Sequence, residues 1–235
     1  MAGETAKTEA VCLRIVPWSR TSHIVTWLTP TGPLTTVVKG AVRPKSVFLG
    51  QYDLNYTCEL VHYLRGSGDL KPLRECRPLD LRETLRADYR LLALAGRVRE
   101  VAERLAPQGP EAAEWFALVT RTLDRLAVRD RRAPALLAEL LAFEIGALRL
   151  AGLAPEIEAG NGAFSLRGER QIPVSAEVAR AISSPLETRD PKILLDTARA
   201  IGVFYSFHLD LALDSRRNVL RLISTNEEGT GKQDG

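Results

Sequence analysis

The chain has 235 residues, of which 45% are hydrophobic and 26% charged, and its formal net charge is +3. This length suits one large domain or two small ones, and no apolar run approaches the ~20 residues that span a bilayer. The polar N-terminus, with Glu4 and Glu9, does not fit a signal peptide. The cysteines, Cys12, Cys58 and Cys76, are too scattered for a disulfide framework or a zinc knuckle. We therefore expect reduced, mostly buried thiols in a cytoplasmic protein.

The sequence of the first third of the chain has a pattern typical of short β-strands. β-branched and aromatic residues gather in five runs, and Gly or Pro residues separate the runs. We predict strands at residues 10–16, 23–29, 34–39, 52–64 and 70–76. Five short strands in about 70 residues predict a small β-barrel of the OB or SH3 type.

After Pro78 the apolar residues recur at helical spacing. Asp80 with Glu83 resembles a capping box, which predicts the start of a helix that Pro107 ends. Pro110 can occupy the first turn of the next helix. A helical domain is therefore expected after the barrel.

The remaining elements follow from similar signals. A third helix is predicted over residues 134–150, and the segment 154–174 is loop-like because Gly and Pro are frequent in it. Ser175 is expected to cap a short helix, and Asp190 precedes a last long helix that is expected to end near residue 213. We predict domains at residues 1–79 and 80–225, followed by a disordered tail at 226–235.

No pattern indicates catalysis. The three histidines, His23, His62 and His208, have no Cys, Asp or Glu at ligand spacing, and no Gly-x-Ser-x-Gly elbow is present. The tail sequence 229–232 superficially resembles a phosphate loop, but Gln233 stands where Ser or Thr is needed. We expect a protein that is not an enzyme and that uses no cofactor.

Charge distribution gives the best functional signal. The 43 residues from Ala10 to Tyr52 contain no Asp or Glu. Five cations lie in this window: Arg14, Arg20, Lys39, Arg43 and Lys45. A basic segment without acids can accept a polyanion without repulsion, which indicates nucleic-acid binding, whereas a solvated loop is the alternative.

Aromatic residues in the window could stack on bases. Trp18 is the best candidate, because Pro17 and Ser19 flank it in a predicted turn. Trp27 lies between apolar residues and fits the core better. Phe48 and Tyr52 fit the core and a stacking platform about equally.

Several motifs resemble the RecO family of bacterial recombination mediators. The resemblance is most specific at Val16–Ser22, Val25–Gly32 and Lys39–Ser46, where order, spacing and strand context agree. Phe143-Glu144 and Ser215-Arg216-Arg217 match weaker features of the family.

The resemblance implies an α+β protein, with an N-terminal five-stranded OB-fold β-barrel that binds DNA and an all-helical C-terminal domain. It implies binding of single- and double-stranded DNA, annealing of complementary strands and loading of RecA onto coated single-stranded DNA. The implied partners are RecR, sometimes RecF, and the C-terminal tail of single-stranded-DNA-binding protein, in the nucleoid. No small-molecule substrate and no membrane partner are implied.

The sequence departs from the family pattern in two places. Many relatives carry a four-cysteine zinc site after the third helix, but residues 154–174 contain no Cys and no His. We expect a degenerate, cysteine-free insertion without metal, shaped as a hairpin of 164–166 and 171–174. Relatives often have Arg before Phe143, whereas Ala142 stands here, so Arg149 is a candidate for holding the acidic tail.

We predict that the barrel binds DNA through eight residues. They are Arg14, Arg20, Lys39, Arg43, Lys45, the weaker candidates Lys71 and Arg74, and the stacking residue Trp18. Most contacts are expected at phosphates, so sequence preference should be slight. Two alternatives remain: an interaction scaffold whose OB module no longer binds DNA, and an RNA-binding OB-fold protein.

Overall fold

The computed structural model describes residues 3–65, 68–128, 132–160, 163–167, 172–208 and 214–224. The chain divides into two compact units, residues 1–83 with 98–124 and residues 84–97 with 125–235. The helices α1 (Tyr89–Leu105) and α2 (Ala112–Val128) each contribute to both units. The sequence did not indicate that residues 98–124 belong with the barrel.

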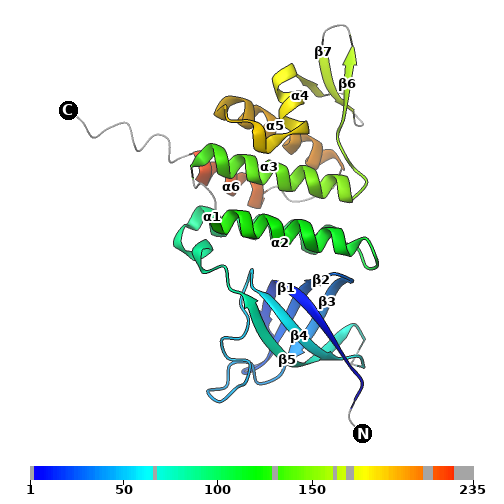
Figure 1. Cartoon of the computed structure of the whole chain (residues 1–235), viewed down its shortest axis with the longest axis vertical. Helices are drawn as coiled ribbons and strands as arrows, with labels where there is room; N and C mark the ends of the chain where they lie inside the picture. The colour runs from blue at the N-terminus through cyan, green and yellow to red at the C-terminus, as the bar shows by residue number, and fades with distance from the viewer. Residues whose placement is uncertain are drawn as a thin grey trace, which may run out of the picture. The chain divides into compact units, whose positions relative to one another are not determined.

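The first unit contains a closed five-stranded barrel (Figure 1). Its strands are β1 (Thr5–Pro17), β2 (His23–Thr29), β3 (Gly32–Val38), β4 (Thr57–Tyr63) and β5 (Leu70–Asp80). The order is β1-β2-β3-β5-β4, with β1 closing on β4 and β3 running parallel to β5. This order is that of an OB fold, so the expected fold is confirmed and the SH3 alternative is wrong.

Alternate side chains along the strands fill the interior of the barrel. Successive side chains of a strand point to opposite faces, so every second residue enters the interior. Interior residues include Ala10 and Cys12 of β1 and Val25 and Trp27 of β2. The buried indole of Trp27 donates a hydrogen bond of 2.8 Å to Thr36 Oγ1, which satisfies its polar atom. Trp27 is therefore a core residue, as predicted.

The helical part of the first unit is bonded to the barrel. The guanidinium of Arg99 donates to the carbonyl of Leu13 over 2.7 Å, and Gly109 N–H donates to the carbonyl of Thr31 over 3.0 Å. Val11 and Leu13 are 0% and 1% exposed, although they are not among the interior cluster. The outer face of β1 is thus buried at Val11 and Leu13, while Lys7 and Glu9 of that face are exposed.

The predicted capping box at Asp80 and Glu83 is wrong. Asp80 ends β5, and its carboxylate accepts a hydrogen bond of 3.0 Å from the backbone N–H of Arg82. A short 3-10 helix, η1 (Glu83–Ala87), follows, and α1 begins only at Tyr89. Asp88 precedes α1 and accepts from Arg90 N–H over 2.8 Å, so the helix starts there.

The second unit is mainly helical. It contains α3 (Ala133–Leu150), α4 (Ala176–Ser183), η2 (Pro185–Glu187), α5 (Pro191–His208) and α6 (Asp214–Ser224). The Oγ of Ser175 accepts from Val178 N–H over 3.2 Å, which confirms the predicted cap of α4. The last predicted helix is α5, and α6 was not expected.

A small sheet replaces the loop expected over most of 154–174. β6 (Glu156–Gly160), β7 (Ala163–Arg167) and β8 (Ile172–Val174) pair in this order, all antiparallel (Figure 1). The pairing of β7 with β8 confirms the hairpin. The residues between β7 and β8, 168–171, and the predicted tail 226–235 lie outside the described residues. Within the described residues, no helix combines the length and apolar content that crossing a membrane requires.

Candidate functional site

A tight turn joins β1 to β2 and carries Trp18 and Arg20. Trp18 N–H and Ser19 N–H both donate to the carbonyl of Ser22, over 2.9 and 3.3 Å. The turn leaves the indole of Trp18 56% exposed, and Arg20 is exposed beside it. The sequence prediction that Trp18 lies at a turn is therefore confirmed.

The connection between β3 and β4 runs from Lys39 to Tyr56 as a series of turns. Arg43 N–H donates to the carbonyl of Gly40, and Ser46 N–H donates to the carbonyl of Arg43, over 3.2 and 2.9 Å. Leu49 N–H donates to the carbonyl of Ser46 over 3.3 Å. Gly40 has φ of 67°, a left-handed conformation that glycine adopts without steric cost.

Side chains from this connection pack into the barrel core. Ala41 and Phe48 are 3% and 9% exposed and belong to the barrel core. Tyr52 packs edge-on against Trp27 with ring centroids 5.9 Å apart, and its hydroxyl lies 2.8 Å from Nδ1 of His23. Burial raises the pKa of Tyr52, so its hydroxyl stays protonated. Phe48 is therefore a core residue, and Tyr52 is partly buried and packs against the core.

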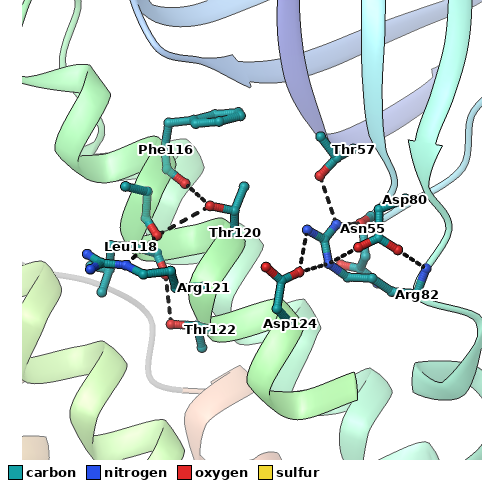
Figure 2. A network of polar contacts seen from close by, with 11 residues as sticks. Asn55, Thr57, Asp80, Arg82, Phe116, Leu118, Thr120, Arg121, Thr122 and Asp124 are labelled. Carbon is teal, nitrogen blue, oxygen red and sulfur yellow. Dashed lines mark hydrogen bonds and ion pairs between the residues drawn. The ribbon is translucent and has the colours of Figure 1, made fainter. Parts of the chain in front are cut away.

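A buried arginine fixes the far end of the connection (Figure 2). One guanidinium nitrogen of Arg82 donates to the carbonyl of Asn55 over 2.7 Å and to Thr57 Oγ1 over 2.9 Å. Its Nε donates to Asp124 of α2 over 2.7 Å, while Asp80 lies 3.7 Å away. The Arg82 side chain is only 3% exposed, so these bonds compensate its loss of hydration.

The β1–β2 turn and the β3–β4 connection are joined by hydrogen bonds. Val42 N–H donates to the carbonyl of Thr21 over 3.3 Å, and Gly40 N–H donates to Ser22 Oγ over 3.3 Å. We call residues 18–22 together with 39–49 the two-loop surface. The barrel thus brings together two segments that the sequence separates by a hairpin.

Four of the predicted cations lie on the two-loop surface. Arg20, Lys39, Arg43 and Lys45 are exposed, and across the described parts of the chain none of them forms an ion pair. The stretch contains no carboxylate. Unpaired cations are free to meet an anion without first giving up a partner.

The other three predicted cations are placed differently. Arg14 Nε donates to Glu103 of α1 over 2.6 Å, and Arg74 pairs with Glu75 at 3.2 Å. Lys71 Nζ donates to the carbonyl of Gly68 over 3.1 Å. Their role in binding stays a prediction: Arg14 and Arg74 would first have to give up an ion pair, whereas Lys71 is partly buried and bonds to a carbonyl.

The cysteines lie in the barrel. Cys12 and Cys58 are buried, and Cys76 is partly buried, as the sequence predicted. Burial raises the pKa of Cys12, and a hydrogen bond with Cys58 is the main cause of the raised pKa of Cys76. Among the side chains that the structure describes, no group of His, Cys, Asp and Glu is arranged to hold a metal ion.

The strand order, the turn-rich β3–β4 connection and the helices that follow define an OB-fold protein with a helical extension. Residues 1–82 match the family model described as "Recombination protein O N terminal", and residues 86–162 match "Recombination protein O C terminal". The chain belongs to the RecO family of DNA repair proteins.

Curated relatives bear the same description. A "DNA repair protein RecO" from Moorella thermoacetica is 26% identical over 259 aligned positions, which cover 96% of this chain and 94% of that protein. Proteins of this description from Salinibacter ruber and Anaeromyxobacter dehalogenans are 32% and 31% identical. Those two alignments cover 54% and 66% of this chain, and the chain spans only 49% and 60% of the relatives' own length.

Proposed function

We propose that this protein is a recombination mediator that binds single- and double-stranded DNA through the two-loop surface. The observation that carries this proposal is the set of unpaired cations, Arg20, Lys39, Arg43 and Lys45, on touching loops without a carboxylate. The β1–β2 loop, which carries Arg20, is one of the loops at which OB folds bind oligonucleotides. Membership of a family of DNA repair proteins supports DNA as the polyanion.

The expected contacts are mostly electrostatic. Each phosphate that a Lys or Arg neutralises releases counterions, so affinity should fall linearly with the logarithm of salt concentration. Arg20, Lys39, Arg43 and Lys45 bond to phosphates, and the exposed Trp18 stacks on a base. We propose that the protein acts by binding and not by covalent chemistry, at the nucleoid in the cytoplasm.

The mediator role adds strand annealing, loading of RecA and docking to partners. The partners are RecR, in some relatives RecF, and the acidic C-terminal tail of single-stranded-DNA-binding protein. Arg149 is exposed near the end of α3 and is the candidate cation for that tail. Pull-down of RecR and of a tail peptide, with Arg149→Gln as the variant, tests these contacts.

The DNA proposal is tested by fluorescence anisotropy of a labelled oligothymidylate of about 20 nucleotides at two salt concentrations. We expect micromolar or tighter binding that weakens with salt, and faster annealing of complementary strands. A scaffold would give no salt-dependent change in anisotropy. An RNA-binding OB protein would prefer a structured RNA over the oligothymidylate, and either result would contradict the proposal.

A further inference from the structure

Three aliphatic side chains of the two-loop surface are exposed. Val42, Val47 and Leu49 are 46%, 77% and 56% exposed, and they lie between and beside Arg43 and Lys45 in the sequence. Single exposed aliphatic residues are ordinary, but three within one short connection expose apolar surface to water beside the cations, and we call these three side chains the aliphatic patch. Sequence periodicity did not reveal this patch, because the segment is neither helix nor strand.

The connection holds these side chains in place. Phe48 points into the barrel core, so its neighbours Val47 and Leu49 are left outside. Phe48 N–H donates to Ser46 Oγ over 3.2 Å, and Gln51 N–H donates to the carbonyl of Phe48 over 3.1 Å. A surface that is ordered before binding loses less entropy on binding.

A ligand of the two-loop surface must bind the cations and also cover the exposed aliphatic side chains. The phosphates of duplex DNA satisfy the cations, but its base faces are stacked inside and cannot meet Val47 or Leu49. An unpaired strand offers both phosphates and open apolar base faces.

We infer that Val42, Val47 and Leu49 contact unpaired bases, so that the two-loop surface binds single-stranded DNA in preference to duplex. This inference rests on the proposed function, because it assumes that DNA is the polyanion. The cations then supply affinity for both forms of DNA, and the aliphatic patch supplies the difference between them.

The test is the double variant Val47→Ser with Leu49→Ser in the full chain, measured with oligothymidylate and with a duplex of the same length. Both side chains are exposed, so the variant keeps the core. We expect about tenfold weaker binding of the single strand, the effect of burying roughly one aliphatic side chain, and a change within about twofold for the duplex. The slope of affinity against salt should stay the same, because no cation is removed.

Val128→Ser with Val203→Ser is the matched control, since these valines are 82% and 40% exposed and lie on α2 and α5. The control should bind both DNAs like the unaltered protein. Equal losses for single strand and duplex, or no loss for either, would overturn the inference. An unaltered protein that binds neither DNA would instead defeat the proposed function. Loss of binding to an acidic peptide, with oligothymidylate binding kept, would assign the patch to a protein partner and also overturn the inference.

Discussion

Arg216 Nε in α6 donates hydrogen bonds to both carboxylate oxygens of Glu144 in α3, over 2.9 and 3.0 Å. The two side chains are 4% and 0% exposed, and Arg97 Nε reaches the same carboxylate over 3.2 Å. Arg216 also donates to the carbonyl of Ala198 over 2.8 Å, and a Cβ on Gly202 would lie 2.6 Å from its Nη1. The two weak family motifs in the helical half therefore meet in one buried charge cluster of the second unit.

Replacing Glu144 by Gln should destabilise the protein strongly. The variant removes the carboxylate that Arg216 and Arg97 share, and breaking a buried pair in this way typically costs about 3–5 kcal/mol. Urea unfolding followed by circular dichroism measures the loss. Hydrogen exchange in α6 should rise in the same variant, because Arg216 loses its partner.

The control for this prediction is Arg199→Ala. Arg199 forms an exposed ion pair with Asp196 at 2.7 Å, and its side chain is 77% exposed. An exposed pair contributes about 0–1 kcal/mol. Similar losses of stability in the two variants would show that the buried cluster does not stabilise the second unit.

Replacing Arg82 by Met should loosen the end of the β3–β4 connection. The carbonyl of Asn55 and Thr57 Oγ1 each lose a hydrogen-bond donor, which predicts a loss of about 2–3 kcal/mol in unfolding free energy. Arg77→Met is the control on the neighbouring strand, because Arg77 is 67% exposed and pairs only with Glu59 in the part of the chain described. Chemical denaturation measures the unfolding free energy of both variants. An equal loss in the two would contradict the role given to Arg82.

Tryptophan fluorescence should report DNA binding through Trp18 alone. The chain has three tryptophans, and Trp27 and Trp115 are 0% and 1% exposed. Saturating oligothymidylate should quench part of the emission by stacking on Trp18, and Trp18→Phe should abolish that quenching. Trp18→Ala should weaken binding by about 1–3 kcal/mol, the value of one base stack. Quenching that persists in Trp18→Phe would rule out stacking at this position.

The barrel cysteines should react slowly and should make stability fall at alkaline pH. The pKa values of Cys12 and Cys76 are raised in the fold, whereas an unfolded thiol has a pKa of about 8.5. The stabilising contribution is therefore complete below that value and is lost as the pH rises above it, because only the unfolded thiols ionise readily. Iodoacetamide should label the native protein slowly at pH 8 and the denatured protein rapidly. Cys76→Ala should lose less stability between pH 8 and pH 10 than the unaltered protein, and a parallel loss would contradict this explanation.

Local signals allowed much of the fold to be predicted. The strand at 23–29 and the cap at Ser175 depend on neighbouring residues, and both are confirmed. The capping box predicted at Asp80 is wrong because the Asp80 carboxylate accepts a hydrogen bond from Arg82. Arg82 in turn has partners far away in the sequence, such as Asp124. Leu92 follows the helical spacing yet is 41% exposed, since periodicity alone cannot show what covers a face.

The candidate site was predictable only in part. Acid depletion located the cations, but it could not separate the unpaired Arg43 from Arg14, whose partner Glu103 lies 89 residues away. The exposure of Val47 and Leu49 depends on Phe48 turning into the barrel, which a turn-rich segment does not reveal. Tertiary contacts therefore decide which residues of the acid-free window face solvent.

The central claim is tested most directly by the salt dependence of oligothymidylate binding in Lys39→Gln/Arg43→Gln/Lys45→Gln. The control is Lys7→Gln/Arg77→Gln/Arg199→Gln, which removes the same charge from exposed cations that pair with Glu59 or Asp196. Each lost phosphate contact lowers the slope of log affinity against log salt by about 0.7 for a single strand, so the first variant should lose about 2. The control should keep the slope of the unaltered protein. An unchanged slope in the folded first variant would contradict DNA binding by the two-loop surface.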